Sequence, residues 1–438
     1  MGTSPQFTFL LIFVMSAVIF YKNFGKIARN INIGKVINKN DNKKDRWKTM
    51  IRVALGQSKM VNRPVAGFFH ILIYVGFVII NIEVVEIIID GIFGTHRVFS
   101  FLGSFYGFLI GSFEILAFLV LVACVVFFFR RNFMSIKRFL SPEMNGWPKS
   151  DANIILVFEV LLMFAFLLMN ASDSLLYQLN DPHYTVAFSN PISQFLIPII
   201  EGNSISSLIL IERASWWFHI LGIFAFLNYL VVSKHLHIIL AFPNVYYSNL
   251  NPLGQFTNMN SVTEEVKKMM DPNIDPFAVS SDATVPDRFG AKDVIDLNKI
   301  QLLNAYSCTE CGRCTSECPA NQTGKLLSPR KIMMDVRDRI HEVGKNIDTN
   351  GTFKDDNKSL LNDYITKEEL WACTSCNACT DACPINIDPL SIIVDLRRYL
   401  VMEESAAPIE LNNIFNNIEN NGAPWQFSTN DRLNWKDE

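Results

Sequence analysis

Eight of the nine cysteines form two runs with the same spacing. The first run is Cys308-x-x-Cys311-x-x-Cys314-x-x-x-Cys318-Pro319 and the second is Cys373-x-x-Cys376-x-x-Cys379-x-x-x-Cys383-Pro384. Three closely spaced thiolates can bind three irons of one cubane, and the following proline frees the fourth cysteine to reach the other cluster. The sequence therefore predicts two [4Fe–4S] clusters, one held by Cys308, Cys311, Cys314 and Cys383 and the other by Cys373, Cys376, Cys379 and Cys318.

A zinc site or a disulfide scaffold fits this pattern less well. Structural zinc favours separated cysteine pairs rather than two repeated four-cysteine runs. Disulfide frameworks spread cysteines along a small secreted chain. The ninth cysteine, Cys124, stands alone in an apolar stretch, and we expect it to be a small core residue.

The first half of the chain is apolar enough to lie in a membrane, so any functional side chains in it must lie there too. Half of the 438 residues are hydrophobic and only 18% are charged, which is too apolar for an ordinary soluble enzyme. Five apolar stretches can cross a hydrocarbon core of ~30 Å. They cover about residues 7–22, 65–90, 102–129, 151–171 and 214–241. The sequence thus predicts a five-helix membrane bundle over residues 1–243.

Histidines in such a bundle need a partner or a metal. His219 and His237 are 18 residues apart, about five turns, so both would face one side of a continuous helix. His70 would lie level with His237 and His96 level with His219. Because low-spin haem iron takes two axial imidazoles, these pairs predict two b-type haems. The alternative is a set of isolated polar residues, and His235 is expected to be interfacial or to lie near a haem propionate.

Charge divides the chain into two unlike parts. Residues 1–243 carry 20 Lys and Arg against 13 Asp and Glu, whereas residues 244–438 carry 19 against 29. Basic residues gather in 22–63 and 130–149, so the positive-inside rule places these loops in the cytoplasm. We therefore expect an outside N-terminus and a cysteine-rich half in the cytoplasm, at a bacterial-type inner membrane. No strongly basic domain is present to bind nucleic acid.

The bundle resembles the gamma subunit of respiratory nitrate reductase and the cytochrome b subunit of membrane heterodisulfide reductases over about residues 60–245. The resemblance rests on Arg63-Pro64-x-x-Gly67-x-x-His70, Trp217-x-His219 and Ser233-Lys234-x-x-His237-Ile238. It implies five spans that hold two b haems and exchange electrons with a membrane quinone. Where the nitrate reductase subunit has another histidine in its second span this chain has Ile80, so the outer haem depends on His96.

Carboxylates in the second span provide a candidate quinone site. Glu83, Glu86 and Asp90 are spaced i, i+3 and i+7 and share one helix face. A carboxylate inside a membrane is costly and usually has a function. Here we expect Glu83 and Glu86 to exchange protons with a quinone. Ion pairing with Arg97 or Arg213 is the alternative.

The cysteine-rich half is expected to be helical. Ser328-Pro329 and Asp388-Pro389 each begin a helix, and Thr366-x-x-Glu369 is a capping box. Residues 295–405 resemble the α-helical ferredoxin of fumarate reductase iron–sulfur subunits and of the ferredoxin-like heterodisulfide reductase subunit. Residues 244–294 are expected to be a linker with one short helix. The predicted fold class is all-α: a transmembrane dihaem bundle followed by a dicluster ferredoxin.

The tail, residues 406–438, contains Glu419-x-x-Gly422-x-Pro424-Trp425 and also resembles a heterodisulfide-reductase-related protein. In that family this stretch precedes a domain with Cys-Cys-Gly motifs, and this chain contains no Cys-Cys pair. The resemblance implies a separate cytoplasmic iron–sulfur subunit that docks near residues 405–438. A solvated tail is the alternative.

These features together predict a membrane-bound electron-transfer subunit between a cytoplasmic redox partner and the quinone pool, with the substrate site on another subunit. One alternative is a quinone oxidoreductase that serves electron-transfer flavoprotein or another flavoprotein dehydrogenase. The other alternative, from a different class, is a redox sensor or assembly scaffold. The electron donor, the direction of flow and the type of quinone stay open at this point.

Overall fold

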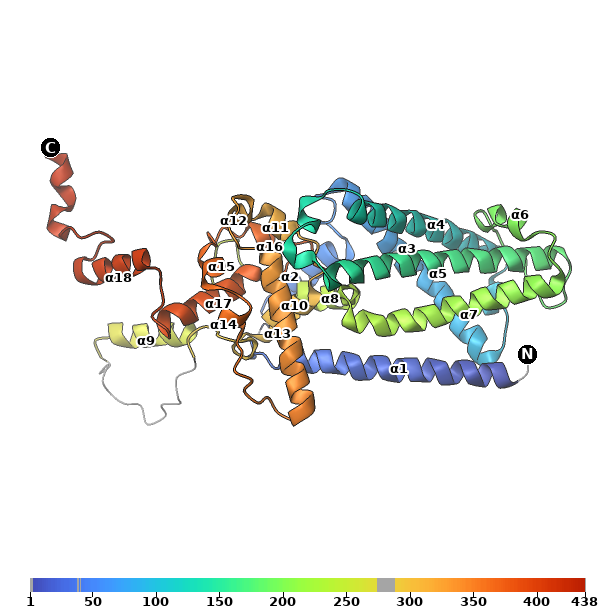
Figure 1. Ribbon diagram of the computed structural model, residues 1–438, viewed down its shortest axis with the longest axis horizontal. Coiled ribbons are helices and arrows are strands. Elements are labelled where there is room, and N and C mark those ends of the chain that lie inside the picture. The colour runs from blue at the N-terminus through green and yellow to red at the C-terminus, as the bar shows by residue number, and fades with distance from the viewer. Residues whose placement is uncertain (1–2, 38, 40, 274–287, 438) are drawn as a thin grey trace.

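The computed structural model describes residues 3–37, 39, 41–273 and 288–437, and these residues form helices and no named strand. Five long helices lie alongside one another, and a group of shorter helices covers one end of them (Figure 1). The long helices are α1 (Thr3–Asn32), α3 (Pro64–Phe93), α4 (Ser104–Asn132), α5 (Trp147–Gln178) and α7 (Ile205–Tyr229). The all-α fold class is confirmed.

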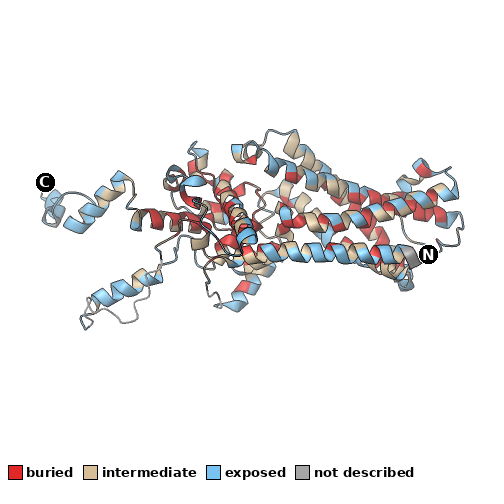
Figure 2. Ribbon diagram, turned by 60° about the horizontal axis from the view of Figure 1, so that its bottom comes forward, coloured by how far each residue is buried: buried red, intermediate tan, exposed pale blue. Residues whose placement is uncertain are grey.

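All five long helices are apolar and long enough to cross a membrane. In α1, Phe7, Leu11 and Met15 are each more than half exposed, and Figure 2 shows much of this helix as exposed. Large apolar side chains that face outward over a whole helix require an apolar solvent. The chain is therefore a membrane protein.

The prediction of one continuous helix over 214–241 is wrong. Helix α7 ends at Tyr229, short 3-10 turns follow, and α8 (His237–Tyr246) begins at His237. Ser233 interrupts the helix because its backbone is extended, and its side chain accepts a hydrogen bond from the His235 N–H. His219 and His237 therefore do not share one helix.

The shorter helices form the cysteine-rich domain. They are α10 (Lys299–Ser307), α11 (Arg313–Glu317), α12 (Pro319–Gln322), α13 (Pro329–Asn350), α14 (Leu360–Asp363), α15 (Lys367–Trp371), α16 (Ala378–Ala382) and α17 (Pro389–Met402). Side chains of Ser328, Thr366 and Asp388 cap α13, α15 and α17, and Thr366 forms the predicted capping box. The predicted helix starts are confirmed.

The bundle and the cysteine-rich domain share a hydrophobic core. Ile27 of α1 and Leu240 of α8 are buried in the same cluster as Leu302 and Ile340 of the domain. The loop segment with α2 (Lys43–Met50) also packs on α8 at this end. The cysteine runs are thus held rigidly against one end of the bundle.

Two elements project from this body. Helix α9 (Asn260–Met270) falls in the predicted linker, part of which, 274–287, lies outside the described residues. Helix α18 (Ile409–Asn421) and the chain after it extend beyond the cysteine-rich domain (Figure 1). Apolar side chains of this tail are exposed, including Ile409, Phe427 and Trp435.

Candidate functional site

The two cysteine runs fold in the same way. Glu310 and Ser375, each between the first two cysteines of its run, have φ of 56° and 58°. Gly312 and Asn377, each after the second cysteine, are also left-handed. A short helix follows in both runs, and these two helices, α11 and α16, pack on each other. The two runs therefore share the same backbone turn before their short helices.

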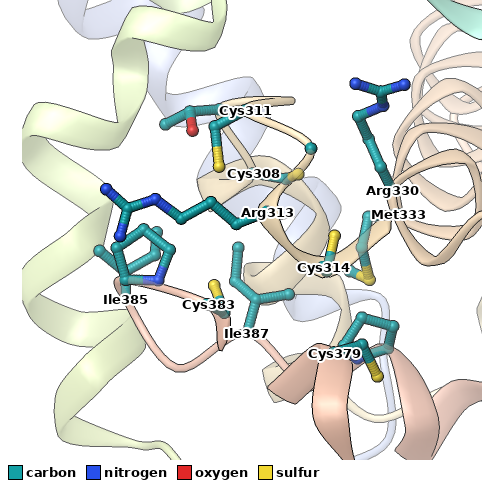
Figure 3. Close-up of a pocket in the computed structure, with 14 residues that line it drawn as sticks. Cys308, Cys311, Arg313, Cys314, Arg330, Met333, Cys379, Cys383, Ile385 and Ile387 are labelled. Atoms are coloured by element: carbon teal, nitrogen blue, oxygen red, sulfur yellow. The ribbon is translucent and has the colours of Figure 1, made fainter. Parts of the chain in front are cut away.

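A cavity between the runs is lined by Cys308, Cys311, Cys314 and Cys383, the four ligands predicted for the first cluster (Figure 3). Cys379 also lines this cavity. Cys318, Cys373 and Cys379 of the second set lie close enough to interact electrostatically with one another. Cys379 also interacts with Cys314 of the first set, so the division of the thiols into two ligand groups stays a prediction.

The chemistry of this donor set fits iron–sulfur clusters. Among the described residues, no three metal-binding side chains lie close enough together to hold a single metal ion. The sulfurs instead surround a cavity, which suits a cubane held by four separate thiolates. Burial raises the pKa of Cys308 to about 12 and of Cys383 to about 11, so binding of iron must supply the charge that deprotonates these thiols.

The first cysteine run faces the bundle. Arg313 donates to the carbonyl oxygens of Lys59 and Met60 at 2.9 and 3.3 Å, in the turn that leads into α3. Glu310 is 2% exposed and forms ion pairs with Lys234 and with Arg337. Lys234 lies in the turns between α7 and α8, so the first run contacts two elements of the bundle.

The second cysteine run is partly open to solvent. Cys376 is exposed. Arg397 of α17 donates to the Cys373 carbonyl at 2.5 Å and lies over the Trp371 ring. Ala378 occupies the position that Arg313 has in the first run. The second run is thus supported mainly by Arg397, and Lys59 of the bundle also donates to the Asp381 carbonyl at 3.0 Å.

Three histidines lie at the end of the bundle that contacts the first run. The His70 and His237 ring centroids are 6.5 Å apart, and His235 lies on the other side of His237 with a centroid separation of 5.4 Å. The Nδ1 atom of His237 is 3.2 Å from the Lys234 carbonyl oxygen, whereas the Nδ1 atom of His70 is buried without a partner. The structure brings His70 and His237 together as predicted, although by a helix break rather than by helical periodicity.

The other predicted histidine pair is arranged differently. His96 Nε2 lies 3.3 Å from an Asp173 carboxylate oxygen, and its ring packs on His183. His219 Nδ1 is 2.9 Å from the Leu162 carbonyl oxygen. No ring contact joins His96 and His219 in the described part of the chain, and their pairing stays a prediction.

A polar pocket lies at the opposite end of the bundle, among α3, α5 and α7. Glu83, Glu86 and Asp90 line it from one face of α3, as predicted, together with Arg97 and Asp173. The Glu86 carboxylate accepts from Tyr106 Oη at 3.0 Å. Arg97 binds Asp173 at 2.7 Å and lies 4.0 Å from Glu83. The other oxygen of Glu83, Oε2, is buried without a hydrogen-bond partner.

The sequence analysis missed the contribution of α5 to this pocket. Asn170 and Asp173 are both buried and both accept from Arg97. The predicted span ended at residue 171, but α5 continues to Gln178. In a sequence, a run of small polar residues after an apolar stretch resembles a loop. The one indication that these residues have polar partners is the row of carboxylates on one face of the second span.

A family profile described as a 4Fe-4S dicluster domain matches residues 307–387. The chain carries a dicluster iron–sulfur domain. This match covers both cysteine runs and confirms the iron–sulfur assignment of the cavity region.

Several characterised proteins are similar to the chain. The probable iron-sulfur-binding oxidoreductase FadF of Bacillus subtilis is 29% identical over 87% of this chain and 54% of the relative. The EtfAB:quinone oxidoreductase of Syntrophomonas wolfei is 27% identical over 99% of this chain and 58% of the relative. One subunit of the ferredoxin/F(420)H(2)-dependent CoB-CoM heterodisulfide reductase of Methanosarcina acetivorans is 33% identical over 27% of this chain and 60% of the relative.

The first two of these relatives are longer proteins, and this chain spans just over half of their length. No solved structure matches the chain. The relatives are iron–sulfur oxidoreductases or subunits of them, and the predicted resemblance of the cysteine-rich half to a heterodisulfide reductase subunit is confirmed.

Proposed function

We propose that this chain is a quinone-linked electron conduit, which passes electrons between a cytoplasmic redox partner and the membrane quinone pool. The observation that carries the proposal is the position of the first cysteine run, whose Arg313 and Glu310 contact the same end of the bundle that holds His70 and His237. Two [4Fe–4S] clusters and b-type haem supply the electron chemistry, and the protein positions them.

The His70 and His237 pair fits the axial ligands of a haem. Two imidazoles bound to one iron at ~2 Å have ring centroids roughly 6 Å apart, and the observed separation is 6.5 Å. The Nδ1 atom of His237 faces a backbone carbonyl, which leaves Nε2 for a metal. His96 and His219 remain the predicted ligands of a second haem.

The polar pocket at the far end of the bundle is the proposed quinone and proton site. Its buried Glu83 has one oxygen with no partner, and Glu86 is held by Tyr106 and by the Phe99 N–H. The other Glu83 oxygen forms an ion pair with Arg97 at 4.0 Å, so the carboxylate is held in place while the free oxygen is available to accept a proton. Glu83 is therefore the proposed proton acceptor, with Arg97 and Glu86 positioning it.

The orientation and the partners follow from the same arrangement. By the positive-inside rule, the basic loops 22–63 and 130–149 favour a cysteine-rich domain in the cytoplasm and an N-terminus outside, and the described parts of both loops lie at the cysteine-rich end of the bundle. The relative named EtfAB:quinone oxidoreductase favours an electron-transfer flavoprotein as the donor. A Cys-Cys-Gly iron–sulfur unit is the other proposed partner, and it would dock near residues 405–438, where apolar side chains are exposed.

Difference spectra of membranes that contain the full chain test the haem proposal. We expect a b-type α-band in reduced-minus-oxidised spectra, and loss of one haem on replacement of His70 or His237 by Ala. The matched control is His235→Ala, which should retain that haem. A wild-type spectrum without a b-type band would contradict the proposal.

A further inference from the structure

Arg313, which lies outside the membrane spans, is a buried charge with no carboxylate partner in the described part of the chain. Its side chain is 6% exposed. Its side chain donates hydrogen bonds to the carbonyl oxygens of Lys59 and Met60 and to the Met60 sulfur, all of which are neutral. Arg313 forms no ion pair with any carboxylate among the residues that the structure describes. Burying a guanidinium is unfavourable unless a negative charge compensates it.

Two of the first-cluster cysteines lie beside this guanidinium. Arg313 lines the cavity and runs between Cys311 and Cys383 (Figure 3). Both thiols are close enough to interact with it electrostatically. Four thiolates around a [4Fe–4S] core give a net negative charge, which is the compensation that Arg313 lacks within the protein.

The second cysteine run has Ala378 at the equivalent position. Its guanidinium comes from Arg397 of α17, which donates to the Cys373 carbonyl and interacts electrostatically with Cys373. Arg397 is half-buried, whereas Arg313 is buried and also lies close enough to interact electrostatically with His70 of the bundle. Arg313 is therefore a buried cation on the side of the first cluster site that faces the histidine pair.

We infer that Arg313 is the counter-ion of the first [4Fe–4S] cluster and raises the midpoint potential of that cluster. This inference rests on the proposed electron-conduit function. A reduced cluster carries one more negative charge than an oxidised one, so a fixed positive charge stabilises the reduced form. The step concerned is the transfer of one electron between the two clusters, with no bond made or broken.

Redox titration of the purified full chain tests this inference. Midpoint potentials of the two clusters would be followed by electron paramagnetic resonance in wild type, Arg313→Gln and Arg313→Lys, with mediators and without quinone. The two signals are assigned with Cys311→Ser and Cys376→Ser, each of which removes one cluster. We expect Arg313→Gln to lower the potential of the first cluster only and Arg313→Lys to keep it near wild type.

Each outcome decides the point. Unchanged potentials in Arg313→Gln, or equal shifts of both clusters, would overturn the inference. If Arg313→Gln loses the first cluster while Arg313→Lys retains it at the wild-type potential, the positive charge is required and the inference stands. If both variants lose that cluster, the role of Arg313 is packing and the inference fails. Because no quinone is present, failure of the quinone proposal would not alter these results.

Discussion

The two cysteine runs have the same backbone conformation, but the side chains that surround them differ. Both place a non-glycine residue and then a second residue in left-handed conformations before a short helix. The first run carries Glu310 and Arg313 at positions where the second has Ser375 and Ala378. The charged pair contacts the bundle, whereas Cys376 of the second run is exposed.

This difference shows how two copies of one motif can form cluster sites with different surroundings. The spacing of the cysteines determines what is bound, and it is the same in both runs. The residues between the cysteines determine which cluster faces the membrane and which faces the surface. Under the proposed function, the exposed second run is the place where a soluble redox partner would exchange electrons with the chain.

Loss of a single cluster is the largest effect we expect. Cys311→Ser should remove the first cluster and Cys376→Ser the second, each lowering the iron content by about half. Electron exchange between the bundle and the remaining cluster should survive only in Cys376→Ser. Iron analysis and electron paramagnetic resonance measure both effects, with Cys124→Ser as the control that keeps both clusters. Full iron content in either ligand variant would refute the assignment.

Breaking the buried ion pairs of Glu310 should follow in size. Glu310→Gln leaves Lys234 and Arg337 without their shared carboxylate, which we expect to destabilise the protein by about 3–5 kcal/mol. The matched change in the second run, Ser375→Ala, should alter stability by less than ~1 kcal/mol. Thermal unfolding of the detergent-solubilised chain compares the two. Equal losses would mean that the contacts of the first run with the bundle add nothing.

The contact of Glu143 with α13 should have a smaller, pH-dependent effect. Burial opposes ionisation of Glu143, but hydrogen bonds from Arg330 and Ser328 outweigh it and lower the pKa of this carboxyl below 4.5. Its contribution, about 2 kcal/mol, is present above pH 4.5 and is lost as the pH falls through the lowered pKa.

Thermal unfolding of wild type and Glu143→Gln at a series of pH values measures this contribution. The difference in stability should be constant from pH 8 to pH 5 and should disappear in more acidic solution. A difference that grows toward acidic pH would have the wrong sign for this contact.

The smallest expected effect is a difference in oxidative damage. Cys376 is exposed, whereas Cys308 and Cys383 of the first cluster are buried. Because susceptibility follows exposure, a mild oxidant should destroy the second cluster several-fold faster than the first. The decay of the two electron paramagnetic resonance signals over time measures this ratio. Faster loss of the first cluster would mean that the first cluster, and not the second, is the one exposed to solvent.

The sequence was sufficient for features that depend on local spacing. The dicluster iron–sulfur domain follows from the repeated cysteine interval, and the caps at Ser328, Thr366 and Asp388 follow from side-chain chemistry within one turn. The shared face of Glu83 and Glu86 follows from helical periodicity.

Features that depend on contacts distant in the sequence were not accessible. His70 and His237 lie close together as predicted, but the prediction required a continuous helix, and Ser233 interrupts that helix. Asn170 and Asp173 lie near the end of the predicted span, where a polar residue is ordinarily solvated, and their buried partners Arg97, Glu114 and His96 come from other parts of the chain. The pairing of Lys234 with Glu310 joins residues 76 apart, which no periodicity reveals.

The most direct test of the conduit is reoxidation of the clusters by quinone through the bundle. The full chain would be reduced, freed of excess reductant and mixed with a quinone, and the cluster signals would be followed in wild type and in His70→Ala. We predict that quinone reoxidises both clusters in wild type and leaves them reduced in His70→Ala. Equal reoxidation in the two proteins, or none in wild type, would contradict the account.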